Sequence, residues 1–265
     1  MFIDINAYVG HWPFRQLVNN TLADLDRVAQ EQGITHMVVA NIEGLFFKDT
    51  QDANRKLLAE YKAYTGKTVF LPLAMVNPTY PEWELEARTM IEEGFMGFEI
   101  APQYHLYPFP PHLPYDSYRN IHPAGDVIRL AAELDVPVRV CCSFENFRAR
   151  SNYEKHENPG VGDILSLMNV NKETHLFITS FFAPSVAAAA KERANTYFDF
   201  LGATPGAINT VADTSYAAAI SDDQLCYGSL APMQYFEPSL IAMEYGAFNA
   251  DKAKVNAARA FKCLR

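Results

Sequence analysis

The stretch FIDINAYVGHWPF, Phe2–Phe14, decides how the rest of the chain is interpreted. Its first half is a short apolar run with a polar side chain at every second position: Asp4, Asn6 and Tyr8. Side chains along a strand alternate between two faces, so these three are expected to share one face of a buried strand and Ile3, Ile5 and Ala7 the other. A glycine and a proline then end the run. The stretch therefore predicts the first strand of an α/β enzyme, with the alternative that Asp4 only caps a neighbouring loop.

The same kind of apolar run recurs along the chain and alternates with helical periodicity. The further strands are expected at Thr35–Asn41, Val69–Val76, Gly97–Ala101, Pro137–Cys142, His175–Ser180, Thr196–Leu201 and Gln224–Ser229. Eight strand–helix units at this length favour a parallel (β/α)8 TIM barrel over an open sheet. Because the composition nowhere changes abruptly, residues 1–265 are expected to form a single α/β domain, with room for distortion of the barrel.

One segment has no period at all. Residues Gln103–His122 follow the fourth predicted strand and are rich in proline, tyrosine and histidine. The C-terminal ends of barrel strands carry the active site, and long loops there are usually functional. The segment is therefore expected to fold as a lid whose aromatic side chains line the mouth. Those side chains are Tyr104, Tyr107, Phe109, Tyr115 and Tyr118.

Composition limits the classes of partner. The 265 residues carry a formal net charge of −9, which argues against nucleic acid or an anionic membrane as the main partner. The four cysteines show no CxxC spacing and indicate free thiols in a reducing compartment. With no export signal or apolar span in the sequence, a cytoplasmic protein is expected. A small molecule is the expected substrate or ligand, and a homo-oligomer is left open.

The sequence contains none of the common motifs that bind nucleotides or cofactors. Neither GxGxxG nor GxxxxGK[ST] occurs, which removes the main support for a dinucleotide or nucleoside triphosphate site. The histidines are scattered without an HxH or HExxH spacing. The sequence therefore predicts no cofactor.

Six segments, taken in order, carry a resemblance that runs from end to end. They are IDINAY at the start, Gly94–Tyr107, the VPVRV run before Cys141, HLFITS at His175–Ser180, YGSLAP at Tyr227–Pro232 and NAARAF at Asn256–Phe261. Together they resemble the amidohydrolase superfamily, in its amidohydrolase-related (family 2) branch of metal-dependent TIM-barrel hydrolases and decarboxylases. The resemblance implies a barrel with its pocket at the C-terminal ends of the strands.

The chain departs from that family at the metal ligands. Carried over position by position, the ligand positions hold Asn6, Tyr8, Ala101, Cys141, Ser180 and Leu230, or Ser229 if the last segment slips by one. Catalytic divalent metals need imidazole and carboxylate donors, usually three or more. The resemblance thus supports the fold and the pocket, while the departures predict no metal site of the usual kind.

Catalysis without that metal requires a general base and donors for a developing oxyanion. The candidate catalytic residues are His105, Tyr8, Asn6 and Asp4. His105 is the preferred base because a neutral imidazole is available near pH 7. The alternatives are that His105 packs among tyrosines and that the polar side chains form a network filling the barrel top.

The candidate substrate-binding residues lie on the strand ends and the loops that follow them. They are His11, Trp12, Tyr104, Arg139, Cys141, Ser180 and Arg148. Arg139 lies on a buried strand, so it must clamp a substrate carboxylate or pair internally with Glu99 or Asp4, and pairing is favoured. Glu99 is the expected partner because it lies on the preceding strand with the same inward alternation. For Cys141, an inert buried thiol is favoured over a nucleophile.

These observations predict a hydrolase of the amidohydrolase-related type. It is expected to hydrolyse a C–O or C–N bond of a small polar organic substrate without the usual divalent metal, by analogy with the family. The alternative is a non-catalytic descendant that binds a ligand or a partner on the same barrel, because loss of the ligands predicts that equally well.

Overall fold

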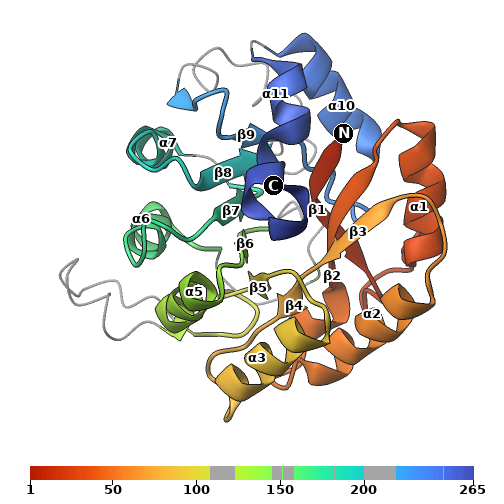
Figure 1. Ribbon diagram of the computed structural model, residues 1–265, viewed down its shortest axis with the longest axis vertical. Coiled ribbons are helices and arrows are strands. Elements are labelled where there is room, and N and C mark those ends of the chain that lie inside the picture. The colour runs from red at the N-terminus through yellow and green to blue at the C-terminus, as the bar shows by residue number, and fades with distance from the viewer. Residues whose placement is uncertain (108–122, 145–150, 152–157, 182, 200–218, 247) are drawn as a thin grey trace.

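The structure is a computed structural model that describes residues 1–107, 123–144, 151, 158–181, 183–199, 219–246 and 248–265 (Figure 1). The strands are β1 Ile3–Val9, β2 His36–Asn41, β3 Val69–Pro72, β4 Ala74–Met75, β5 Phe98–Ile100, β6 Val138–Cys141, β7 Leu176–Thr179, β8 Thr196–Asp199 and β9 Leu225–Cys226. The helices are α1 Leu22–Glu31, α2 Gln51–Ala63, α3 Trp83–Glu93, α5 Pro123–Leu134, α6 Val161–Met168, α7 Pro184–Ala190, α10 Phe236–Tyr245 and α11 Ala250–Val255. No described helix is long and apolar enough to cross a bilayer.

All strand pairs are parallel and follow the chain order, β1-β2-β3 and then β4 through β9. Strands β3 and β4 are the two halves of the predicted third strand, which is interrupted at Leu73. The Leu73 N–H donates to the carbonyl of Val39 on β2 at 2.8 Å, whereas the next residue, Ala74, donates to Gly97 beside β5 at 3.0 Å. Pro72, which has no N–H, ends the first half. The strand thus joins the two sheets.

Backbone hydrogen bonds also join the first strand to the last. The Ile5 N–H donates to the Tyr227 carbonyl at 2.9 Å, the Leu230 N–H to Asn6 at 2.7 Å and the Tyr8 N–H to Ala231 at 2.7 Å. Strand β1 thus has hydrogen-bonded neighbours on both sides, β2 on one and the segment that follows β9 on the other. The predicted (β/α)8 barrel is confirmed as the fold, with helices packed around the strands (Figure 1).

The apolar residues divide into two layers. Strand residues such as Ile178 and Phe198 belong to the cluster that also contains the helix residues, and form the layer between sheet and helices. Their neighbours Phe177 and Tyr197 belong to a second cluster, inside the barrel. This alternation along each strand is the period of two expected of a barrel whose interior and exterior are both buried.

Strand β1 deviates from simple alternation. Its pairing register with β2 shifts between Asp4 and Ala7, and Ile3, Ile5 and Tyr8 all belong to the inner cluster. The Asn6 N–H donates to the Asp4 carboxylate at 2.9 Å, which stabilises this bulge. The expectation that the isoleucines occupy the face opposite Tyr8 is therefore wrong, because one extra residue in β1 changes the face.

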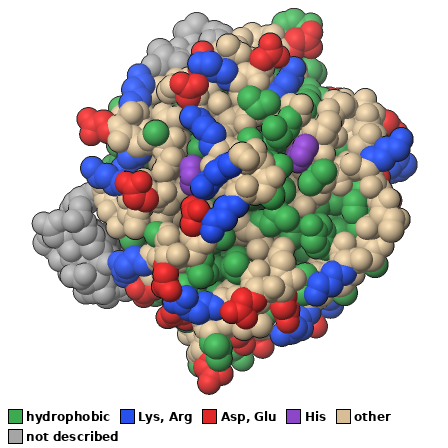
Figure 2. Space-filling view, in the orientation of Figure 1, with side chains coloured by type: hydrophobic (Ala, Val, Ile, Leu, Met, Phe, Trp, Pro, Cys, Tyr) green, Lys and Arg blue, Asp and Glu red, His purple; other side chains and the backbone are tan. Residues whose placement is uncertain are grey.

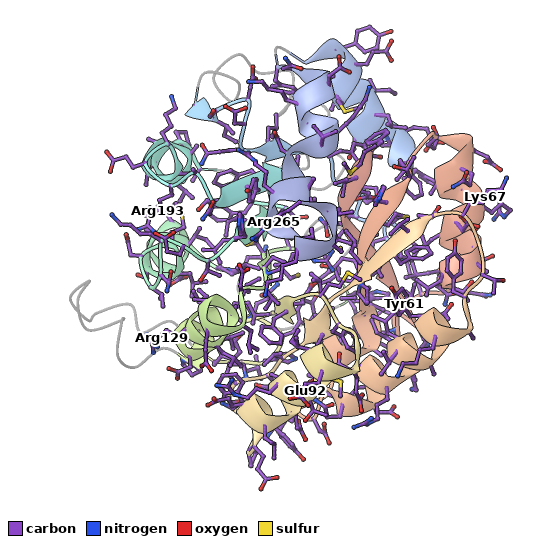
Figure 3. All side chains as sticks on the ribbon, in the orientation of Figure 1. Tyr61, Lys67, Glu92, Arg129, Arg193 and Arg265 are labelled. Carbon is purple, nitrogen blue, oxygen red and sulfur yellow. The ribbon has the colours of Figure 1, made fainter. Side chains whose placement is uncertain are left out.

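The C-terminal segment covers the N-terminal end of the barrel. It contains short 3₁₀ turns at Asn256–Ala260 and Lys262–Leu264, and the Phe261 ring stacks on Phe177 at 5.9 Å. Figure 1 shows this segment across the centre of the barrel, and Figure 3 places Arg265 there. On this face Lys and Arg side chains are interspersed with Asp and Glu (Figure 2). The opposite end, where the strands terminate, is therefore the place for a site.

Candidate active site

An amide from the middle of β1 meets a carboxylate at the C-terminal end of β8, beside the residue that follows β7. Asn6 Nδ2 donates to Asp199 Oδ2 at 2.8 Å and to Ser180 Oγ at 3.4 Å, while the Ser180 N–H donates to Asp199 Oδ1 at 3.0 Å. Asn6 and Asp199 are fully buried and Ser180 is 2% exposed. The carboxylate fixes the Asn6 amide, so its Oδ1 must face the other way, and there it has no partner among the described residues. These three residues are called the amide–carboxylate cluster below.

Two backbone conformations mark the same end of the barrel. Ser180, directly after β7, and Leu230, in the segment that follows β9, have left-handed φ values of 55° and 59°. Residues with side chains adopt this region at a cost of order 1–3 kcal/mol, and such strain is concentrated at functional sites. Two of the six non-glycine residues with left-handed φ in the described part of the chain thus lie beside the amide–carboxylate cluster.

Asp4 ties the barrel seam beneath this cluster. Its carboxylate accepts the Ser229 N–H at 3.0 Å, the Ser229 hydroxyl at 2.5 Å and the Asn6 N–H at 2.9 Å. Burial raises the pKa of Asp4, and the bonds from Ser229 oppose that rise. Asp4 therefore caps the loop around Ser229, as in the alternative interpretation of the sequence, and its carboxylate is not open to a substrate.

A buried ion pair occupies the centre of the barrel. Arg139 Nε donates to Glu99 Oε2 at 2.5 Å, and the Tyr8 hydroxyl donates to Glu99 Oε1 at 2.6 Å. Arg139 Nη1 donates to the carbonyls of Ile5 and Val38, both at 2.9 Å. Arg139 Nη2 bonds Glu99 and, at 3.3 Å, the Ala7 carbonyl. The pairing with Glu99 is confirmed.

This network has consequences for two predicted site residues. All five N–H donors of the Arg139 guanidinium are engaged, so it cannot clamp a substrate carboxylate and that assignment is corrected. The Tyr8 hydroxyl uses its proton on Glu99. Burial raises the pKa of Glu99, with Arg139 opposing, and burial raises that of Tyr8 far above its usual range. Tyr8 is therefore a neutral phenol held by Glu99.

Aromatic rings cover this centre on the side of the mouth. The Phe144 ring packs 4.7 Å from Tyr8, 5.9 Å from Trp12 and 5.7 Å from Tyr104, and Phe46 packs 5.1 Å from Trp12. Trp12 is fully buried. We call Trp12, Phe14, Phe46, Tyr104 and Phe144 the mouth cluster. Tyr104 thus brings the start of the predicted lid to the barrel mouth; residues 108–122 of that lid lie outside the described residues.

His105 contacts Gly44 and Tyr107, and no hydrogen bond or ring contact among the described residues joins it to Asn6 or Tyr8. Its Nε2 donates to the Gly44 carbonyl at 3.0 Å, so Nδ1 is the acceptor, and it has no partner among the described residues. Burial lowers the pKa of His105 to about 4. A base this weak removes few protons at neutral pH, so the structure does not support His105 as the general base.

The remaining predicted residues fall into separate places. His11 is exposed and lines, with Trp12, a surface hollow of about 440 Å³. Cys141 is buried with its Sγ 3.6 Å from Gln103 Nε2, and burial raises the pKa of its thiol well above the usual range, which fits the inert reading. Arg148 lies outside the described residues.

Asp199 was not among the residues predicted from the sequence. It is the only acidic residue of the run TYFDFL, at the C-terminal end of β8. A lone carboxylate in an apolar strand needs a partner and is the signal that could have identified it. Its partner, Asn6, comes from the other end of the chain, so the sequence offered no local pairing.

The residues at the family's metal positions do not fit a divalent ion. The Asn6 amide faces a carboxylate, the Tyr8 proton is used on Glu99, and the Cys141 thiol stays protonated. Ala101 and Leu230 offer no side-chain donor. Among the described residues, no three His, Cys, Asp or Glu side chains gather closely enough to hold a metal ion. The Arg139 guanidinium also places a positive charge beside the first strand.

Comparison with known proteins identifies the fold. No protein-family model and no curated protein matches the chain. A solved 2,6-dihydroxybenzoate decarboxylase from Rhizobium is similar with a TM-score of 0.68 at 12% identity, over 99% of this chain and 98% of that one. A dihydroxybenzoic acid decarboxylase from Polaromonas, with bound manganese, gives 0.68 at 15% identity over 100% and 97%. A Staphylococcus aureus protein classed as an amidohydrolase gives 0.65 at 14% over 98% and 99%. The chain thus shares its barrel fold, from end to end, with these decarboxylase and amidohydrolase structures.

Proposed function

We propose that this chain is a hydrolase on an amidohydrolase-type barrel. It hydrolyses a C–O or C–N bond of a small polar organic molecule at the C-terminal ends of the strands, without the usual divalent metal. The observation that carries the proposal is the buried Asp199 carboxylate held by the Asn6 amide and the Ser180 N–H. Ser180 and Leu230, which both have a left-handed backbone conformation, lie at the same end of the barrel.

This arrangement supplies a general base. The Asp199 carboxylate, oriented by the Asn6 amide and the Ser180 N–H, takes a proton from water, and the resulting hydroxide adds to a carbonyl carbon of the substrate. When the tetrahedral intermediate collapses, the C–O or C–N bond breaks and the leaving group takes the proton from Asp199. Asn6 orients the carboxylate through Nδ2, and its Oδ1, which has no partner among the described residues, is an acceptor for a donor group of the substrate.

The names of the structural neighbours support an enzymatic activity for this fold, and the residues of this chain argue against the metal. Two of them are named as decarboxylases, one with bound manganese. In this chain the metal positions hold residues that do not fit such an ion, as described above. We therefore assign the proton transfer to a side chain, Asp199, in place of a metal-bound water.

A substrate screen with a matched pair of variants tests the proposal. Chelator-treated protein is assayed on panels of esters, lactones and amides, and the best substrate is then measured with Asp199→Asn and Asp251→Asn. Asp251 is the control because its side chain is 94% exposed on α11. Loss of the base is expected to lower kcat by about 100-fold or more, while the control keeps the wild-type rate. Equal rates in the two variants would contradict the role of Asp199.

The mouth cluster favours a second candidate, a non-catalytic ligand-binding protein. Trp12, which follows β1, and Phe144, which follows β6, pack against each other at the barrel mouth, with 0% and 1% of their surfaces exposed. They would hinder the entry of a substrate between these two strands. Under this alternative the folded wild-type protein turns over no member of the panels. It still shows saturable, stabilising binding of a small molecule in a thermal-shift screen.

A further inference from the structure

A groove lies beside the barrel mouth, with Phe46 and Tyr104 of the mouth cluster in its wall and no residue of the amide–carboxylate cluster in its lining. Its volume is about 560 Å³, within the range of sites that hold small organic ligands. It is bounded by the loops after β2, β4 and β5 and by the start of α5. The lining residues that the argument uses are Phe46, Phe47, Lys48, Tyr104, His105 and Leu106.

The walls of the groove are apolar and open to solvent. Phe46 and Tyr104 pack edge to face at 5.6 Å and form the inner wall, continuous with the mouth cluster. Phe47 is 47% exposed and Leu106 is 71% exposed. Large apolar side chains that gather around one hollow mark a binding surface more often than single exposed ones do. Flat rings suit walls of this kind because aromatic pairs stack or meet edge to face.

The groove carries a single kind of charge. Among the described lining residues, Lys48 is the only charged one, and it forms no ion pair with a described side chain. The whole chain is acidic, with a formal net charge of −9, so a lone ammonium on an apolar wall is a local exception. An anionic group placed there gains a charge-assisted hydrogen bond. His105 remains a neutral part of the groove, since its Nε2 is held by the Gly44 carbonyl.

We propose that this groove is a binding site for a flat, apolar organic anion, whose anionic group pairs with Lys48 and whose rings lie against Phe47 and Leu106. The site is separate from Asp199 and Asn6, so the proposal does not depend on the hydrolase function. The barrel centre, by contrast, is occupied by the fully buried ion pair of Glu99 and Arg139.

The test compares two dyes that differ in the anionic group. The probes are 1-anilinonaphthalene-8-sulfonate and its uncharged counterpart N-phenyl-1-naphthylamine, titrated by fluorescence against the full chain. Lys48→Gln is expected to weaken binding of the sulfonate about tenfold and to leave the uncharged dye unchanged. The control is Lys67→Gln, an exposed lysine at the outer edge of the molecule, before β3 (Figure 3), and it is expected to alter neither titration.

A second variant tests the walls. Phe47→Ser keeps Lys48 and is expected to weaken both dyes by a similar factor. Thermal melts of all variants verify that the folded state persists, because Phe47 and Lys48 are exposed and their replacement removes no core contact. The proposal is overturned if neither dye binds the folded protein at one site. It is also overturned if Lys48→Gln and Lys67→Gln weaken the sulfonate equally, or if Phe47→Ser changes neither dye.

Discussion

Arg139 has none of its surface exposed, and its five N–H groups reach Glu99 and the carbonyls of Ile5, Val38 and Ala7. The pairing could be predicted from the sequence, because both charges alternate inward on adjacent strands. The three carbonyl acceptors could not, because they belong to the backbone of β1 and β2 and depend on the bulge in β1. A residue that looked suited to a substrate is therefore a cross-link between four strands.

The ion pair predicts a strong coupling. Arg139→Met leaves Glu99 buried with only Tyr8 as a donor, so the free energy of unfolding is expected to fall by about 3–5 kcal/mol. The double variant with Glu99→Leu is expected to recover much of that loss. Urea unfolding of the four proteins of this double-mutant cycle provides the measurement. A coupling energy near zero would contradict the buried pair.

His105 predicts part of the pH dependence of stability. Its pKa is about 4 in the folded protein and near 6.5 in the unfolded chain, so the unfolded state binds more protons between those values. The contribution of His105 to the free energy of unfolding is therefore fully present above pH 6.5 and is lost as the pH falls towards 4. Between pH 7.5 and 4.5, wild type is expected to lose about 2.5 kcal/mol more than His105→Gln, which does not titrate. Equal losses in urea unfolding would show that His105 titrates normally.

At the scale of elements, the strands were predictable in position but not in detail. The run Val69–Val76 was expected as one strand, and its interruption at Leu73 reflects the change of hydrogen-bond partner from β2 to β5. The bulge in β1 depends on Asp4 accepting a bond from Asn6, and a period-two pattern contains no signal for an extra residue. Such local irregularities shift faces, which is why the candidate site had to be revised.

The close approach of β5 and β6 gives an element-scale prediction. A Cβ at Gly97 would lie 2.5 Å from the Pro137 carbonyl oxygen, which belongs to the backbone and cannot move aside freely. Gly97→Ala is therefore expected to destabilise the protein by about 1–3 kcal/mol. Gly162→Ala on α6 is the control, because nothing lies within 4 Å of a Cβ there. Thermal melts that show equal effects of the two changes would mean that the strands are spaced differently.

At the scale of the whole molecule, the fold followed from the alternation of strands and helices and from the order of the resembling segments. Asp199 and Asn6 are 193 residues apart in the sequence and meet only because the barrel closes. The sequence therefore indicated the end of the barrel at which the candidate site lies, whereas the side chains that meet there could be identified only from the three-dimensional structure. The same closure brings the Arg139 cation next to positions that hold metal ligands in the resembling family.

The metal content of the purified protein tests the central claim most directly, namely that side chains replace the divalent metal of this fold. Protein expressed with zinc and manganese in the medium is dialysed without chelator and analysed by plasma emission. Because Asn6, Tyr8, Cys141, Ser180 and Leu230 do not form a ligand set, we expect less than about 0.1 zinc or manganese per chain. About one ion per chain that survives dialysis would contradict the claim.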